Sequence, residues 1–250
     1  MVHQIKRFTL IFLMILALHL FWYVISDEIG VQKIFLPSPY ETYLTLINLF
    51  SQTSFWIDIG ASWLRVSIAF IISIIIAYPL VLLSILNENL KRGLFLIVEF
   101  FRYLPIPVFI PLTILWFGVS DMGKIVVVFL GTFTQMIPMF YDSTLLVKNE
   151  YHAAKIALKW SQLKIVKNVI IKGSAPYIFD NSRLCLGWAW TYLVVAELLG
   201  AEHGIGYAII RAQRYLATDR IFSYIIIIGV MGILTDRIMK LSRNRLFPWA

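Results

Sequence analysis

The sequence predicts an all-α membrane protein that crosses the bilayer several times. Hydrophobic residues make up 60% of the chain and charged residues 14%, against about 45–50% and about 25% in a typical soluble domain. The mean hydropathy is +0.79. A soluble fold of 250 residues could not bury that much apolar surface in one core. These observations exclude a soluble enzyme, a disulfide-stapled secreted domain and a disordered chain as leading interpretations.

Six runs of the chain are apolar and long enough to cross a bilayer as helices, which takes about 20 residues. The first run follows Lys6 and Arg7, as in a signal peptide, but no small-residue cleavage site follows it, so we expect a retained helix. We predict one membrane domain over residues 1–250, with a first span and an outer interfacial segment in 1–58 and a five-helix core in 59–240. The predicted spans are 8–25, 59–86, 94–117, 124–140, 175–199 and 221–239.

Positive charges indicate the orientation of these spans. With the N-terminus inside, most Lys and Arg residues outside the spans fall on the cytoplasmic side. Because loops rich in Lys and Arg stay in the cytoplasm, we expect both termini there. For a membrane protein the position of the charges matters more than their net sum of +8, and no nucleic-acid partner is expected. The opposite side contains only Lys33, Lys124, Arg211, Arg214 and Arg220.

The segment between the first two spans is predicted to lie on the outer surface. Pro37 and Pro39 stop any helix and favour an extended turn. After this turn, apolar residues recur with helical spacing from Tyr43 to Phe50. This pattern predicts a short helix on the membrane interface.

The longest inward-facing loop, residues 141–172, has the pattern of an amphipathic helix with a basic flank, followed by a second helix near 164–171. Lys148, Lys155 and Lys159 lie on the polar side. Two interpretations stay open from the loop alone: the helix rests on anionic headgroups, or it docks into the groove of a cytosolic partner. The apolar positions are Ala153, Ile156, Ala157, Trp160 and Leu163.

Charged residues inside the spans are costly and need partners or a polar cavity. Arg183 and Glu197 lie in the fifth span, about four turns apart and nearly on one face. A polar cavity and packing against another helix both remain open for these two residues. We expect Arg65 to snorkel to the outer interface.

Two further ionic features of the spans are predicted from spacing. Glu99 and Arg102, three residues apart, are expected to pair on one helix face. Asp236 and Arg237 are expected at the inner boundary.

Prolines and glycines predict two breaks in the helices. Pro105, Pro107 and Pro111 remove backbone donors in the third span and should kink it. After the fifth span, Gly204 and Gly206 permit a tight backbone path. This stretch is predicted either to break the helix and re-enter the membrane or to form a plain turn.

An ordered series of motifs runs from about residue 36 to the end of the chain. It includes Leu-Pro-Ser-Pro at 36–39, Ser-Trp-Leu-Arg-Val at 62–66, Phe-Arg-Tyr-Leu-Pro at 101–105 and Ile-Pro-Leu-Thr-Ile-Leu-Trp-Phe-Gly at 110–118. Further stretches lie at 183–190, 194–201, 204–207, 219–222 and 247–249. In this series the chain resembles permease subunits of bacterial ABC importers, in the nitrate/sulfonate/taurine branch of the type I family.

The resemblance implies a type I ABC importer permease fold in the bacterial inner membrane. Its implied partners are two cytoplasmic ABC ATPase subunits, a second permease copy or a homologue, a periplasmic solute-binding protein and membrane lipid. It implies neither a cofactor nor a metal. The implied cargo is a small nitrate-, sulfonate- or taurine-like anion, with a thiamine-precursor pyrimidine or related small organic molecule as the alternative.

The resemblance also assigns roles to particular residues. It makes the loop 141–172 the coupling segment that contacts the ATPases. In the register fixed by Pro176, the family's acidic residue falls on Ala153 and its glycine falls on Lys159. A one-residue shift places the acidic residue on His152 instead. From the charges, glycines and prolines described above, we assign the translocation pathway and gate to Arg183, Trp190, Glu197, Gly204, Gly206, Pro105, Pro107 and Pro111. The coupling residues are His152, Ala153, Ala154, Lys155, Ala157, Lys159 and Trp160.

Other function classes have weaker support in the sequence. The chain has no phosphate-binding loop, so we do not expect it to hydrolyse ATP itself. A secondary transporter or channel would show inverted repeats and ion ligands at mid-membrane, and a hydrolase would show a nucleophile elbow; none is visible. The single Cys185 and the scattered histidines do not have metal-ligand spacing.

Overall fold

The structure is a computed structural model that describes residues 2–249, apart from the side chains of 2–8, 148–150, 152, 154, 199 and 200. Its described part is helical and contains no strand, which confirms the all-α prediction. Short 3-10 or π turns occupy Ile106–Phe109, Val24–Glu28 and Val166–Ile170. The helices are α1 (Val2–Tyr23), α2 (Pro39–Phe50), α3 (Thr53–Leu86), α4 (Glu88–Arg102), α5 (Ile110–Phe117), α6 (Asp121–Leu145), α7 (Lys148–Leu158), α8 (Gln162–Ile165), α9 (Ile171–Gly200), α10 (Ile205–Arg214) and α11 (Thr218–Leu246).

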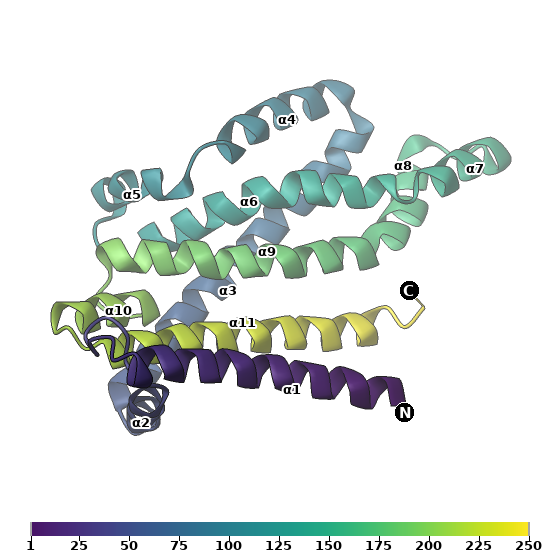
Figure 1. Cartoon of the computed structure of the whole chain (residues 1–250). Coiled ribbons are helices and arrows are strands. Elements are labelled where there is room, and N and C mark those ends of the chain that lie inside the picture. The colour runs from purple at the N-terminus through teal and green to yellow at the C-terminus, as the bar shows by residue number, and fades with distance from the viewer. Residues whose placement is uncertain (1, 250) are drawn as a thin grey trace.

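The core lies where α3, α6 and α9 pack together, with α11 along α9 (Figure 1). Its largest buried side chains include Phe140, Met136 and Leu193. Polar contacts also join these helices: the Ser73 and Thr132 hydroxyls lie 2.7 Å apart between α3 and α6. Asn181 Nδ2 donates to the Met139 carbonyl at 3.0 Å. Such interhelical hydrogen bonds are typical of helix packing in lipid.

Four helices of the described chain, α1, α3, α6 and α11, are long and apolar enough to cross a membrane, or five spans if the bent pair α4–α5 counts as one. The 30-residue α9 packs against α6 along its length. Its charged and polar residues make it less apolar than the helices just named. The architecture therefore approximates the six predicted spans.

The third predicted span, 94–117, is not one kinked helix. α4 and α5 are bent by 90° at the break between them. Pro105 begins the connecting 3-10 turn and Pro111 occupies the first turn of α5, where a proline costs no hydrogen bond. The prolines thus interrupt the span as predicted, and more sharply than a kink would.

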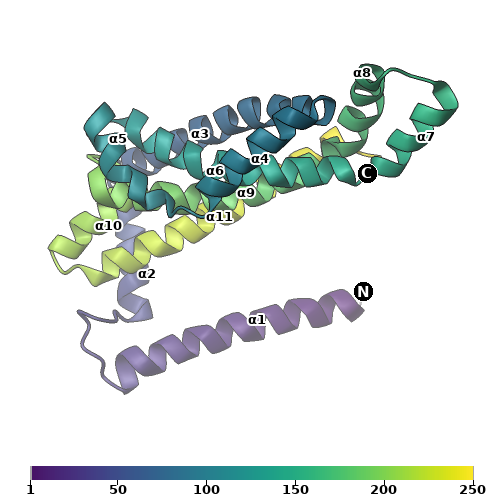
Figure 2. The same cartoon turned by 90° about the horizontal axis from the view of Figure 1, so that it is seen from above.

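α1 stands apart from the rest of the bundle (Figure 2) and contacts it through its last turns. Trp22 stacks on Phe222 of α11 with ring centroids 5.7 Å apart, and its Nε1 donates to the Pro37 carbonyl at 2.9 Å. The predicted interfacial helix is α2. Ser38 caps it by accepting a hydrogen bond from the Glu41 amide at 3.1 Å, and Pro39 opens it.

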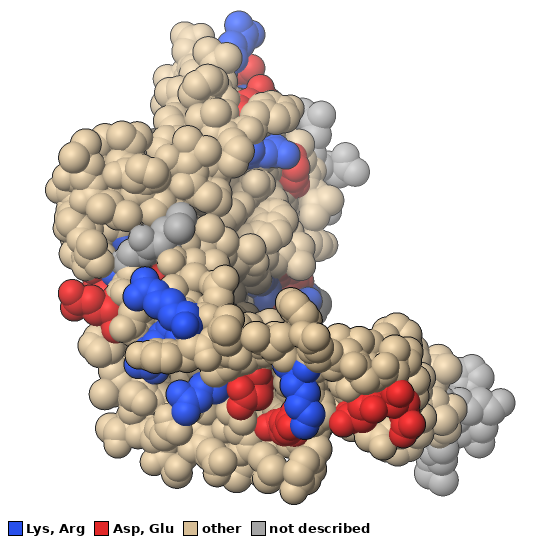
Figure 3. All heavy atoms as spheres, turned by 60° about the vertical axis from the view of Figure 1, so that its left-hand side comes forward, with Lys and Arg blue, Asp and Glu red and all other residues tan. Residues whose placement is uncertain are grey.

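The two ends of the molecule differ in what they carry. Both termini lie at the end where α7 and α8 project, and α2, α5 and α10 lie at the opposite end (Figure 1). We call these the hairpin end and the α10 end. Seen towards the α10 end, Lys, Arg, Asp and Glu side chains gather in patches, whereas much of the surface around them is uncharged (Figure 3).

Candidate functional site

A buried ionic cluster lies at the α10 end, where α3 and α9 meet the start of α10. Glu197 near the end of α9 is only 1% exposed. Arg65 Nη1 of α3 donates to its Oε1 at 2.6 Å. Ser62 Oγ donates to both carboxylate oxygens, at 2.8 and 2.9 Å. The charge of this carboxylate is therefore compensated inside the protein, as a buried charge requires.

The first amides of α10 all donate to side chains from other helices. Gly204 N donates to Asp58 Oδ1, Ile205 N to Ser62 Oγ and Gly206 N to Glu197 Oε2, each at 2.9 Å. Helix N-termini leave such amides unpaired and favour negative charge beside them. Two carboxylates and a hydroxyl thus fasten the start of α10 to α3 and α9.

Glycine is required at both predicted gate positions. Gly204 has a φ of 128°, a region that favours glycine, and a Cβ there would overlap the Glu197 carboxylate. A Cβ on Gly206 would lie 2.7 Å from Glu197 Cβ. The stretch is therefore a close approach of backbone to a buried carboxylate, not the plain turn that was the alternative.

Arg65 is the important residue of this site that sequence reasoning missed. It is 4% exposed and does not snorkel. Its Nε donates to Asp121 Oδ1 of α6 at 2.8 Å, and its Nη1 also donates to the His203 carbonyl at 2.7 Å. Asp58, Ser62 and Arg65 recur with helical spacing on one face of α3, and this polar stripe was the signal available in the sequence.

Arg183 lies away from this cluster, nearer the middle of α9. Its Nε is 2.9 Å from Asp236 Oδ1 of α11, so it faces another helix, one of the two placements left open. Arg243 and Asp180 join the same two helices at 3.4 Å. Asp236 therefore takes part in a contact between helices.

Trp190 is buried between the two charged positions of α9. Its ring meets that of Trp63 edge to face, with centroids 6.1 Å apart. Within the part of the chain that the structure describes, its Nε1 has no hydrogen-bond partner. Both rings line an open cavity of about 170 Å3 against α11.

The predicted pairing of Glu99 with Arg102 is wrong. Both side chains are exposed near the end of α4, and among the described residues neither is within ion-pair distance of the other. An ion pair between exposed side chains contributes little, so the spacing alone gives no strong reason to pair.

The predicted coupling residues lie on a hairpin formed by α7 and α8. Its base is buried, with Val147, Val166 and Ile170 packed against the end of α3. Its tip is exposed: Ile156 is 78% exposed, and Lys155 and Ala157 are also exposed. The side chains of His152 and Ala154 lie outside the described residues.

The expected continuous amphipathic helix from Ala153 to Leu163 is wrong. α7 ends at Leu158 because Lys159 adopts a left-handed conformation, with φ 46° and ψ 33°. Trp160 therefore lies beyond α7, where the Lys164 ammonium sits 4.8 Å from its ring centroid. Glycine is the residue preferred at such a helix end, which explains why the family pattern has glycine where this chain has Lys159.

Comparisons with known proteins match most of the chain. The model of the family described as "Binding-protein-dependent transport system inner membrane component" matches residues 71–248. The taurine transport system permease protein TauC of Escherichia coli (strain K12) is 26% identical over 91% of this chain and 85% of its own length. A relative in Bacillus subtilis (strain 168) named for aliphatic sulfonate transport, SsuC, is 30% identical over 91% of this chain and 83% of its own length.

One more relative and one solved structure extend this likeness. The formylaminopyrimidine transport permease protein ThiX of Halalkalibacterium halodurans is 27% identical over 99% of this chain and 97% of its own length. A chain of the MetNI methionine ABC transporter, solved in inward-facing conformations, superposes with a TM-score of 0.64 at 17% identity. That superposition covers 75% of this chain and 91% of the solved one, and it shows that the two share a fold.

Proposed function

Because this chain belongs to the binding-protein-dependent transport system inner membrane components, the permease subunits of ABC importers, we propose that it carries a small sulfonate-like anion into the cell. It is a multi-pass inner-membrane protein with the type I permease fold. Members of this family work with ATPase subunits and a solute-binding protein. The chain is the translocation subunit, not an enzyme.

We propose that two permease copies, or this chain and a homologue, frame the pathway, and that two ATPases dock on the α7–α8 hairpins. Both termini are then cytoplasmic. Two observations support this orientation: the Lys and Arg residues concentrate on the segments at the hairpin end, and both termini lie at that same end (Figure 1).

The outer gate of this proposal is the start of α10. The observation that carries it is the triple fastening of the Gly204, Ile205 and Gly206 amides by side chains of α3 and α9. A helix start held this way has two discrete arrangements, fastened or released, which is what a switching element requires. Glu197 and the two glycines act as the latch.

The remaining pathway residues are proposed to act beside this gate. Trp190 lines a cavity between α3, α9 and α11. The bent α4–α5 pair, with Pro105, Pro107 and Pro111, supplies irregular backbone, which a membrane tolerates only where protein or water covers it. Arg183 positions α9 on α11 through Asp236.

The sulfonate assignment rests on the relatives named for taurine and aliphatic sulfonate transport. A second candidate cargo has its own support, because the relative named for formylaminopyrimidine transport aligns along 99% of this chain. Both cargos are small and polar. The binding protein, which delivers the solute, is expected to make most of the choice between them.

Uptake into proteoliposomes tests the proposal. The permease is reconstituted with its cognate ATPase and binding protein, and entry of labelled taurine is followed with formylaminopyrimidine as competitor. We expect ATP-dependent taurine uptake that the pyrimidine does not inhibit. Inhibition, or uptake of the pyrimidine in place of taurine, would favour the second cargo, and uptake that continues without ATP would contradict an ABC importer altogether.

A further inference from the structure

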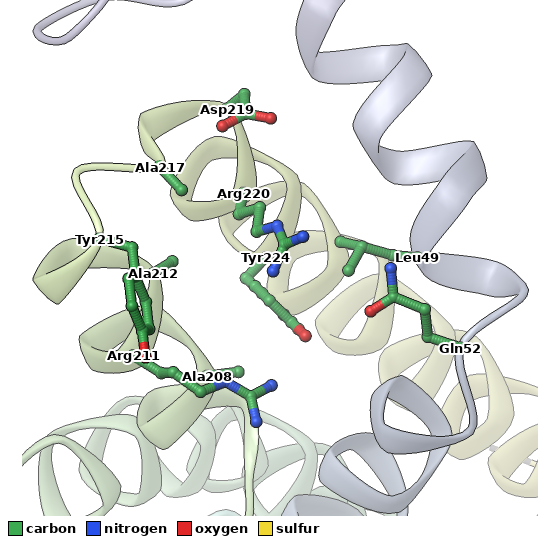
Figure 4. A pocket seen from close by; sticks show the side chains of 10 residues that line it. All are labelled: Leu49, Gln52, Ala208, Arg211, Ala212, Tyr215, Ala217, Asp219, Arg220 and Tyr224. Atoms are coloured by element: carbon green, nitrogen blue, oxygen red, sulfur yellow. The ribbon is translucent and has the colours of Figure 1, made fainter.

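An open cavity of about 430 Å3 lies at the α10 end, between α2, α10 and α11. Its volume is in the range of small-molecule sites in proteins. Figure 4 shows the guanidinium groups of Arg211 and Arg220 pointing into it from two different helices, with the Tyr224 hydroxyl and the Gln52 amide facing the same space. Four donor groups, from α10, α11 and the turn between α2 and α3, therefore converge on one cavity.

The two arginines differ in how they are held. Arg211 is positioned from behind, with its guanidinium 5.5 Å from the Tyr207 ring centroid and Nη2 3.5 Å from Asp58 Oδ2. Among the described residues, the Arg220 side chain has neither an ion-pair nor a hydrogen-bond partner. One guanidinium is thus anchored, and the other lines the cavity with donors that no described protein group uses.

The lining of the cavity contains two arginines and one carboxylate. Asp219 is the acidic residue in the lining, and one of its oxygens accepts a hydrogen bond from Thr45 of α2 at 2.5 Å. Asp58, which pairs with Arg211, does not itself line the cavity. Two like charges in one cavity repel each other, and an oxyanion between them would remove this repulsion while accepting charge-assisted hydrogen bonds from both.

We propose that this cavity is a binding site for one small oxyanion group, of the sulfonate, carboxylate or phosphate type. Bound there, the group links Arg211 of α10 to Arg220 of α11. The site is distinct from the Glu197 latch, and its existence does not depend on which solute the chain carries. Two sources offer this chemistry: a soluble organic anion and the phosphate of an anionic lipid.

Direct binding measurements test the site and separate the two sources. Ethanesulfonate is titrated by calorimetry into the full-length permease purified in an uncharged detergent. In a second arm, phosphatidylglycerol retention in nanodiscs is measured by native mass spectrometry. The test variant is Arg220→Gln, which changes an exposed side chain without a partner and should leave the fold intact. The control is Arg214→Gln, an exposed arginine at the end of α10 that does not line the cavity.

We expect Arg220→Gln to weaken binding of one of these probes about tenfold or more, because charge-assisted hydrogen bonds are lost. Arg214→Gln should change it less than about twofold. Arg220-dependent binding of ethanesulfonate identifies a soluble anion, and Arg220-dependent retention of phosphatidylglycerol identifies a lipid. If neither probe binds, or if both variants bind as the natural chain does, the site does not exist. Because binding is measured without transport, this result is separate from the uptake test.

Discussion

Arg65 is the residue through which three helices are joined. From α3 it reaches Asp121 at the start of α6, Glu197 near the end of α9 and the His203 carbonyl before α10. Removing one partner of a buried ion pair leaves an uncompensated charge, which costs far more than the pair contributes. The residue is therefore a sensitive point for the stability of the whole α10 end.

We predict that Arg65→Leu lowers the stability of the permease by roughly 3–5 kcal/mol, because Glu197 is left buried without its counter-charge. The double variant with Glu197→Leu should recover part of this loss, since apolar residues then replace both charges. Thermal unfolding of the purified protein in detergent measures both.

Arg92→Leu is the control for this pair of variants. Arg92 also contacts a carboxylate, Glu88, at 3.5 Å, but both side chains are exposed, so little change is expected. If Arg65→Leu unfolds at the same temperature as Arg92→Leu, the cluster is not structural.

Individual side chains show where sequence reasoning ends. The glycines at 204 and 206 were found because they mark a special backbone path, and the structure shows the carboxylate that they accommodate. Arg65 was misplaced because its partners lie far along the chain, and hydropathy contains no information on long-range pairs. Lys159 was read as part of a helix face from its spacing, although the family glycine that falls on this position was a signal for the left-handed end of α7.

The α7–α8 hairpin is the element on which the coupling proposal can be tested separately. Its tip is exposed and basic, and its base is packed on the end of α3. A force applied at the tip is therefore carried to α3, the helix that also contributes Asp58, Ser62 and Arg65 to the latch. The hairpin and the latch lie at opposite ends of this one helix.

We expect charge reversal at the tip, Lys155→Glu with Lys159→Glu, to abolish most solute-stimulated ATPase activity while leaving membrane insertion intact. The reason is lost charge complementarity with a docked ATPase. Vesicles with reconstituted transporter give the ATPase rate, and fractionation gives insertion. Lys240→Glu, an exposed change at the hairpin end of α11, should retain the natural rate. A tip variant that also retains it would contradict docking at this hairpin.

The helices and breaks that have a strong signal in the sequence were predicted. The long apolar runs gave α1, α3, α6 and α11, and prolines marked the break between α4 and α5. The angle of 90° at that break could not be predicted, since it depends on how α5 packs on α6. α9 was found from its apolar stretch, and its partners Asp236 and Arg243 on α11 became visible only in the folded bundle.

The arrangement of the whole molecule makes a prediction about topology. Ile156 at the hairpin tip is 78% exposed and Tyr215 after α10 is 80% exposed, whereas the single native cysteine, Cys185, is fully buried. We expect Ile156→Cys to react with a membrane-impermeant maleimide only in inside-out vesicles, and Tyr215→Cys only in right-side-out ones. The natural chain, whose one thiol is covered, should stay unlabelled in both and serves as the control.

Labelling of both variants from the same side would overturn the proposed orientation. At this level the sequence was most informative, because the Lys and Arg distribution and the apolar runs together predicted a bundle with both termini and the basic loop at one end. What it could not supply was the separation of α1 from the other helices (Figure 2), which depends on packing and not on hydropathy.

The capping of α10 by side chains of α3 and α9 also has a consequence for biosynthesis. A helix of ten residues is only marginally stable on its own in water. The start of α10 is capped by the Asp58 carboxylate and the Ser62 hydroxyl of α3, which lie 146 and 143 positions before the amides of Gly204 and Ile205 that they bind. Those groups leave the ribosome long before the segment that needs them. The α10 segment therefore forms a stable helix only after α3 and α9 have packed together. This makes it one of the last parts of the newly synthesised chain to fold.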